Sequence, residues 1–114
     1  MRYALLINER PGATDSHDEH ERAAVTAEYM AFHDDPRVTG GERLQPAETA
    51  TTVRVAGEEV LLTDGPFADT KEIFGGFFLV DAPDLDSALE LAGRVPALRF
   101  GGSVEVRPLV EYGR

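Results

Sequence analysis

Two short segments of this chain are apolar on both faces of an extended strand, and this feature restricts the possible folds most. Residues 3–7 read Tyr-Ala-Leu-Leu-Ile, and residues 77–80 read Phe-Phe-Leu-Val. A strand of this kind is stable only when both of its faces are covered. The rest of the chain offers two helical patterns, and two helices cover one face of a sheet of four or five strands. We therefore expect a second copy of the chain to cover the other face.

The helical patterns are marked by their starting residues. Ser16 and Glu19 have the spacing of a capping box, which predicts a helix from about Ser16 to His33, with Pro36 and then the glycines at 40–41 as its stop. Asp84 is the expected N-cap of a second helix. Before Pro96, its apolar residues recur at helical spacing; they are Leu85, Ala88, Leu89, Ala92 and Val95.

Alternating patterns predict the remaining strands. The segment 44–62 alternates on either side of Gly57 and is typical of a β-hairpin. A strand follows the glycines at 75–76, and Val104 and Val106 share one face of a last strand. The order of elements predicts an α+β fold, a ferredoxin-like sandwich with an extra β-hairpin, built as one domain over residues 1–114. With a second copy on the open face, it becomes a dimeric α+β barrel.

Charge and composition exclude several classes of function. The 114 residues carry 21 acidic and 11 basic side chains, a net charge of −10, so we expect no binding to nucleic acid or to anionic membrane surfaces. The absence of cysteine excludes disulfides, zinc–thiolate sites and a thiol nucleophile. The first apolar segment is too short for a signal peptide or a membrane span, so we expect a cytoplasmic protein.

The most concentrated motif is Thr-Asp-Gly-Pro-Phe-Ala-Asp-Thr-Lys-Glu at residues 63–72, directly after the predicted hairpin. Three further segments accompany it in order: Gly-Glu-Arg-Leu-Gln-Pro at 41–46, Thr-Val-Arg-Val at 52–55 and Asp-Ala-Pro-Asp-Leu-Asp at 81–86. Together they resemble the YCII-related, or DGPF-domain, family over about residues 2–110. The resemblance implies a dimeric α+β barrel of ferredoxin-like protomers.

The resemblance implies less about activity. The wider superfamily includes lyases, isomerases and cofactor-free oxygenases that act on compact cyclic or enolic substrates. The resemblance to YCII-like members implies that a His–Asp pair in a cleft carries the activity. Members of the DGPF branch are often encoded near sigma factors. The family's histidine is not matched securely to His33, because the turn that follows the first helix is shorter here.

The motif supplies three candidate catalytic residues. Asp64 follows a strand and lies beside apolar neighbours, which suits a general acid or base, although Asp-Gly is equally typical of a structural turn. Lys71 is the one lysine among the eleven basic residues. It suits an enolate or an anionic substrate, or simply an ion pair at the surface. Glu72 is an alternative acid–base residue in the same segment.

His33 is the fourth candidate catalytic residue. It follows Tyr29 by four residues, so both side chains project from one side of the first helix and border a cleft between helix and sheet. The alternative is a histidine stabilised at a helix C-terminus by the helix dipole. Tyr29, Phe67 and Arg43 are the candidate substrate-binding residues, with Arg43 as an anchor for a carboxylate.

His17 and His20 lie among acidic residues but lack the spacing of a strong metal site, so we expect neither metal nor cofactor. Our leading hypothesis is a cofactor-independent acid–base enzyme of the lyase or isomerase type, which acts on a small cyclic or enolic metabolite. Asp64 would transfer the proton, helped by His33 or Lys71. The alternative is a non-catalytic ligand-binding or protein-interaction module, for which the resemblance implies a link to sigma-factor regulation. Either protein is expected to be a homodimer.

Overall fold

The computed structural model describes residues 1–65 and 72–113, which form one four-stranded antiparallel sheet, two α-helices and a separate two-stranded hairpin. The sheet order is β2-β5-β1-β6, which is the ferredoxin-like order once the hairpin between β2 and β5 is set aside. The elements, in chain order, are β1 (Arg2–Glu9), α1 (Glu19–His33), β2 (Val38–Arg43), η1 (Ala47–Thr49), β3 (Thr51–Ala56), β4 (Glu59–Asp64), β5 (Ile73–Asp81), α2 (Leu85–Ala92), η2 (Pro96–Phe100) and β6 (Ser103–Pro108).

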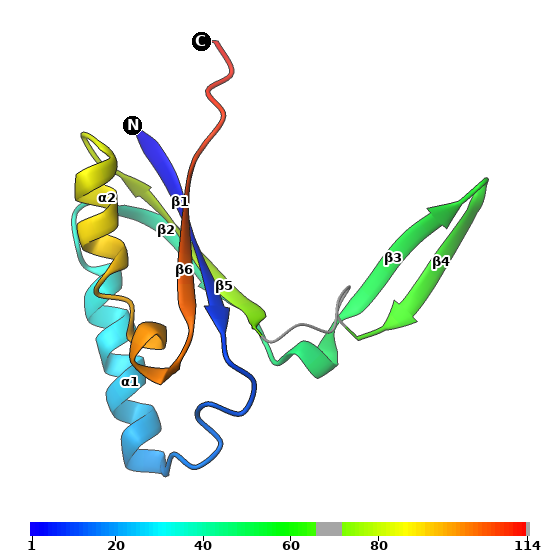
Figure 1. The fold of residues 1–114 in the computed structure, drawn as a ribbon, viewed down its shortest axis with the longest axis horizontal. Coiled ribbons are helices and arrows are strands. Elements are labelled where there is room, and N and C mark those ends of the chain that lie inside the picture. Colours follow the sequence, from blue (N-terminus) through cyan, green and yellow to red (C-terminus); the bar gives the residue numbers. More distant parts are fainter. Residues whose placement is uncertain (66–71, 114) are drawn as a thin grey trace.

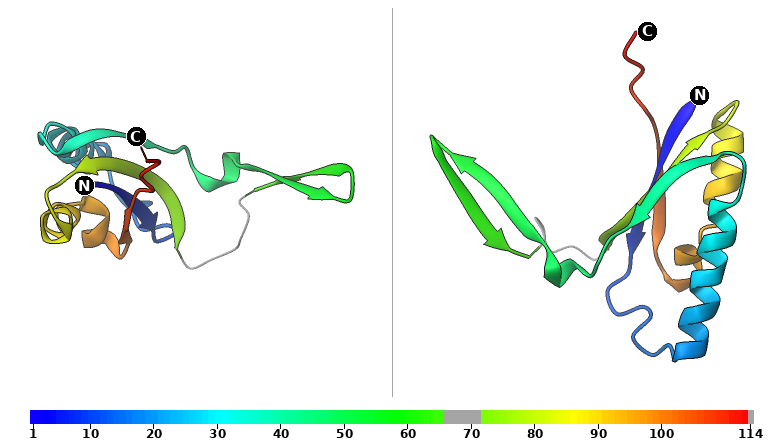
Figure 2. Two further views of the ribbon diagram at one scale, coloured as in Figure 1. Left: turned by 90° about the horizontal axis from the view of Figure 1, so that it is seen from above. Right: turned by 180° about the vertical axis from the view of Figure 1, so that it is seen from behind.

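Both helices cover the same face of the sheet (Figures 1 and 2). Alternate residues of the two central strands point toward the helices and are buried, among them Leu5 on β1 and Phe78 and Val80 on β5. They pack with Phe32 of α1 and Leu91 of α2 in a single core. Neither helix in this described part of the chain is long and apolar enough to cross a membrane.

The opposite face of the sheet carries no helix in the described residues. Here Ala4 and Leu6 of β1 lie directly across from Leu79 and Phe77 of β5, and all four remain partly exposed. The expectation that the central strands are apolar on both faces is therefore confirmed. The protomer leaves one of these faces uncovered.

The hairpin formed by β3 and β4, called the arm below, projects from the sheet on the side away from both helices (Figures 1 and 2). The Cα radius of gyration is 16.2 Å, whereas a compact chain of this length has a radius of about 13 Å. The arm accounts for this extended shape, because it stands clear of the sheet and the helices.

The first helix begins two residues later than the sequence suggests. Its N-cap is Asp18, whose side chain accepts a hydrogen bond from the Glu21 N–H, while the Glu21 side chain accepts one from the Asp18 N–H. The predicted capping box at Ser16 and Glu19 is therefore wrong by two residues, since the sequence contains two overlapping boxes. The predicted end at His33 and the predicted N-cap at Asp84 are confirmed.

Three predicted features of the middle segment are also corrected. The glycines at 40–41, expected to stop a helix, lie inside β2, which pairs with β5. The glycines at 75–76, expected to precede a strand, lie inside β5. The hairpin spans 51–64 rather than 44–62, because the chain first forms the short helix η1.

The stripe expected on the second helix is partly wrong. Ala88, Ala92 and Val95 are buried, but Leu85 and Leu89 are about half exposed, at 48% and 47%. Leu91 takes their place in the core.

Candidate functional site

A cavity of about 480 Å³ lies between α1 and the strands β1, β2 and β5, and we call it the helix–sheet cleft. Its volume is within the range of about 300–1,000 Å³ that is typical of small-molecule sites. The walls are mainly apolar. The polar residues that line it come from β1, from α1 and its C-cap, and from β2; they are Glu9, Thr26, Tyr29, His33, Asp34, Glu42 and Arg43.

Glycines make the space for this cleft. Gly41, Gly75 and Gly76 all line it, on the two neighbouring strands β2 and β5. A Cβ atom on Gly41 would lie 2.5 Å from the Phe77 carbonyl oxygen, and one on Gly76 would lie 2.7 Å from the Glu42 carbonyl oxygen. The close approach of the two strands therefore requires glycine at both positions, and the lack of a side chain at Gly75 leaves room for the side chain of Glu9.

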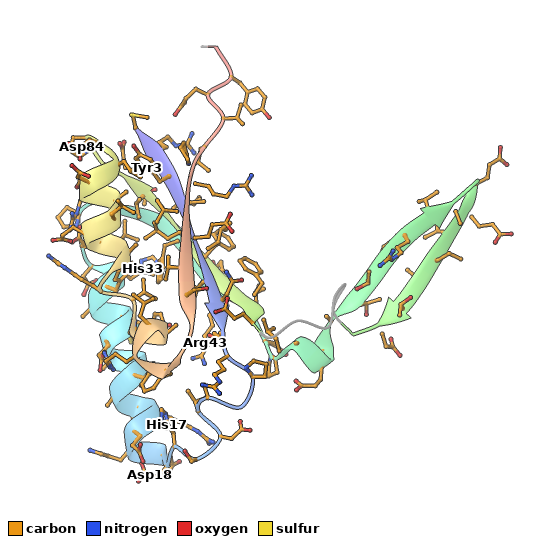
Figure 3. The ribbon with its side chains drawn as sticks, viewed as in Figure 1. Tyr3, His17, Asp18, His33, Arg43 and Asp84 are labelled. Atoms are coloured by element: carbon orange, nitrogen blue, oxygen red, sulfur yellow. The ribbon has the colours of Figure 1, made fainter. Side chains whose placement is uncertain are left out.

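One wall of the cleft is aromatic. Tyr29 stacks on Phe78 with ring centroids 6.3 Å apart, and the His33 ring meets Phe78 edge-on at 5.7 Å. Tyr29 and His33 are four residues apart on α1, so the helix presents both to the cleft. Figure 3 labels His33 on α1 and Arg43 at the end of β2.

Glu9 brings a carboxylate to the cleft from the end of β1. A Cβ on Gly75 would lie 2.6 Å from the Glu9 side-chain carbon Cδ, so the carboxylate lies directly over this glycine. Burial raises the pKa of the Tyr29 hydroxyl, and the nearby negative charge of Glu9 raises it further, whereas Arg43 opposes this effect. Glu9, Tyr29 and Arg43 therefore form one electrostatic group, in which Tyr29 stays protonated as a hydrogen-bond donor.

A second cavity of about 590 Å³ adjoins the first near η1 and η2. The two cavities share Glu9, Tyr29, Arg43 and Gly75. The Glu9–Tyr29–Arg43 group therefore lies where the two cavities meet, within reach of a ligand in either.

An ion-pair network fixes the turn that follows His33. Asp35 accepts hydrogen bonds from the Arg37 guanidinium at 2.9 and 3.0 Å, and Arg37 also contacts the Ser87 hydroxyl at 3.2 Å. The hydrogen bonds from Arg37 lower the pKa of Asp35 to about 2. Because Arg37 also pairs with Glu90, the network ties the end of α1 to α2.

The structure brings together three of the seven candidate site residues, namely Tyr29, His33 and Arg43, in the helix–sheet cleft. Asp64 ends β4 on the arm, where it is exposed, and it is not among the residues that line either cavity. Glu72 is exposed and accepts a hydrogen bond from the Ser103 hydroxyl at 2.7 Å. Phe67 and Lys71 lie outside the described residues.

Sequence reasoning missed Glu9. The register of β1 against β5 shifts between Ile7 and Asn8, opposite the glycine pair, and this irregularity places Glu9 over Gly75. The available signal was the alternation of β1, which puts Glu9 on the same face as the buried Leu5 and Ile7, whereas the shift in register beside Gly75 has no signature in the sequence.

His17, which precedes α1, has partners outside the helix–sheet cleft. His17 packs edge-on against Phe100 with centroids 4.9 Å apart, and its Nε2 lies 4.0 Å from a Glu21 oxygen. Within residues 1–65 and 72–113, no three His, Asp or Glu side chains gather closely enough to hold a metal ion.

Comparisons with known proteins agree on one family. The model of the YCII-related domain matches residues 1–112. An uncharacterized protein of Rhizobium meliloti (strain 1021), R00369, is 37% identical over 117 residues, which cover 98% of this chain and 94% of that protein.

A solved structure shares the fold. It is 5-chloro-2-hydroxyhydroquinone dehydrochlorinase from Burkholderia phenoliruptrix AC1100, in complex with 2,5-dihydroxybenzoquinone. The TM-score is 0.54 at 17% identity, over 98% of this chain and 96% of that one. The match of the family model over nearly the whole length, together with the ferredoxin-like strand order, shows that this chain belongs to the YCII-related domain family.

Proposed function

We propose that the helix–sheet cleft binds a small cyclic metabolite that carries hydroxyl or carbonyl oxygens, and that His33 transfers a proton to or from it. The observation that carries this proposal is the meeting of an imidazole, an arginine and an aromatic wall in one glycine-floored cavity. A flat ring fits such a space, because aromatic rings favour stacked or edge-on contact.

The polar groups of the cleft suit acid–base chemistry on an enol or a phenol. An imidazole can serve as a general acid or a general base, and His33 lines the cleft and meets Phe78 edge-on, so it is the side chain we assign to proton transfer. Arg43 supplies a positive charge for the oxyanion of an enolate, and protonated Tyr29 donates a hydrogen bond. All three groups in this proposal are side chains of the protein.

The dehydrochlorinase that shares the fold supports the choice of ligand class, since its structure is a complex with 2,5-dihydroxybenzoquinone, a small cyclic ligand with hydroxyl and carbonyl oxygens. We take 2,5-dihydroxybenzoquinone as a probe of binding and cyclohexane-1,2-dione as an enolisable probe of proton transfer. The reaction is tested by following exchange of the ring hydrogens of the dione for deuterium by NMR in D₂O.

His33→Gln should abolish most of the catalysed exchange, by about a hundredfold, while the quinone still binds. His20→Gln is the matched control, because His20 is an exposed histidine on the same helix and does not line the cleft. Equal exchange by wild type and His33→Gln contradicts the catalytic role. Quinone binding without exchange in the wild type favours a non-catalytic ligand-binding module.

Asp64→Asn separates this proposal from the mechanism centred on the motif. If His33 transfers the proton, the Asp64 variant keeps its exchange activity, because Asp64 lies on the arm and not among the residues that line the cleft. If Asp64 transfers the proton, its variant loses exchange, whereas the amide retains most of the hydrogen bonding of the turn.

We also propose that the protein is a homodimer in which two sheets pack through their open faces. Ala4, Leu6, Phe77 and Leu79 form the apolar centre of this face. Because a two-fold axis places the same patch on both partners, a single apolar face is enough to build the interface.

A further inference from the structure

One face of the arm is apolar over two neighbouring cross-strand pairs, and the polar pair Thr51–Asp64 lies on the same face at the base of the arm. Directly paired residues of β3 and β4 share a face of the hairpin, and the pairs Val53–Leu62 and Val55–Val60 follow one another on the same side. These four side chains are exposed to 61%, 68%, 67% and 64%, respectively. The other face carries Thr52–Thr63 and Arg54–Leu61 and is more polar.

A hairpin of this kind is unstable in isolation. Two strands alone form a marginal structure in water, because neither face is covered. A contiguous apolar patch that remains exposed in a folded domain indicates an interaction surface. The arm therefore needs another surface for its apolar face.

We propose that the apolar face of the arm packs against a second copy of this chain, so that each protomer of the pair contacts the other through its own arm. The inference extends the homodimer proposed above. It adds a second contact region, outside the sheet, that the sheet-to-sheet contact does not require.

The shape of the protomer favours a second copy as the occupant. The arm diverges from the sheet on the side away from the helices, so that the arm and the open sheet face border one V-shaped space (Figures 1 and 2). A partner seated on the open face lies beside the arm. By two-fold symmetry, the partner's own arm then returns the same contact.

The area that a stable interface must bury favours a second copy as the occupant. A stable interface buries about 800 Å² on each partner, more than four aliphatic side chains supply alone, so the arm needs a second apolar region in the same assembly. The open sheet face is such a region. The net charge of −10 disfavours nucleic acid and anionic lipid as occupants. A second copy carries the same charge, so the burial of apolar surface has to outweigh the repulsion between the two copies.

The first experiment changes the apolar face without weakening the strands. Val55→Thr combined with Val60→Thr keeps two β-branched residues in a cross-strand pair but removes their apolar character. In sedimentation velocity, the wild type should have twice the protomer mass of 12.4 kDa, and the double variant should dissociate about ten times more readily. Leu61→Thr, on the opposite face, is the matched control and should have a much smaller effect.

The second experiment leaves the native apolar face intact. Because the chain has no cysteine, Glu58→Cys at the tip of the arm accepts a single spin label. Labelled protein mixed with ¹⁵N-labelled wild type should broaden amide signals of the partner's described residues through space. Broadening no greater than that from free label overturns the proposal.

The outcomes separate the two claims about assembly. A monomeric wild type at about 100 µM removes both the arm contact and the sheet contact. A wild-type dimer that the double variant leaves unchanged removes only the arm contact. Neither result bears on quinone binding in the helix–sheet cleft, which is measured independently.

Discussion

At the scale of the residue, the environment of Tyr29 explains how a small domain can provide a hydrogen-bond donor that resists ionisation. Its ring is half-buried and stacked on Phe78, and its hydroxyl lies in the field of Glu9. Both effects raise its pKa above the ordinary value of 10. A donor of this kind stays protonated when a ligand oxyanion approaches.

Glu9→Gln should lower the pKa of Tyr29, because the substitution removes a negative charge that disfavours the tyrosinate. The titration is followed by NMR of tyrosine Cζ carbons, which resolves Tyr29 from the other two tyrosines. Glu59→Gln, at the tip of the arm, should leave the pKa of Tyr29 unchanged. A Tyr29 titration that is insensitive to Glu9→Gln contradicts the grouping of these two residues.

Helical spacing was sufficient to place Tyr29 and His33 on the same side of α1 from sequence. The face of Glu9 follows from the alternation of β1, but its contact with Gly75 was not predictable, because it depends on a register shift between β1 and β5 and on the lack of a side chain at Gly75. These are properties of strand pairing, which joins residues far apart in the chain.

At the scale of the element, the junction of α1 with β2 depends on Asp35 and Arg37. The paired guanidinium lowers the pKa of Asp35 from its ordinary value of 3.8 to about 2. A carboxyl with a depressed pKa stabilises the fold fully above its unfolded pKa. This stability is lost as the pH falls through the folded pKa.

Asp35→Asn should therefore lower the free energy of unfolding by about 1 kcal/mol at pH 7, a value reduced for solvent screening of the pair. The difference from wild type should shrink as the pH falls from about 4 to about 2. Urea unfolding at pH 7 and at low pH measures it. Asp86→Asn is a control on the exposed surface of α2, and a difference that persists at low pH contradicts the account.

The elements differed in how far the sequence predicted them. β1 was predictable from its run of apolar residues, and α2 was predictable from its N-cap Asp84 and its helical spacing of apolar residues. β2 was missed because Val-Thr-Gly-Gly-Glu-Arg contains two glycines and lacks an alternating pattern, so only pairing with β5 makes it a strand. The start of α1 was ambiguous because two capping boxes overlap.

At the scale of the whole molecule, the uncovered sheet face and the arm are the two features that a lone protomer leaves unexplained. The apolar character of both faces of β1 and β5 was evident from sequence and led to the expectation of a dimer. That the hairpin stands away from the sheet was not evident, since a hairpin that joins the sheet edge has the same alternating pattern.

Leu79→Arg should convert the proposed dimer into monomers, because it places a charge at the apolar centre of the open sheet face. Leu89→Arg is the matched control, since Leu89 is exposed on α2 and lies on the helical side. Light scattering measures the mass, and circular dichroism verifies the fold. A folded Leu79→Arg protein that keeps the wild-type mass contradicts the sheet contact.

The central claim is that the helix–sheet cleft holds the ligand, and calorimetry with 2,5-dihydroxybenzoquinone tests it most directly. Thr26 and Ala27 are both exposed on α1, but Thr26 lines the cleft whereas Ala27 lines neither cavity. Thr26→Trp should fill the cleft and abolish binding, and Ala27→Trp should bind as the wild type does. Binding that survives Thr26→Trp unchanged, or a wild type that does not bind the quinone, contradicts the claim.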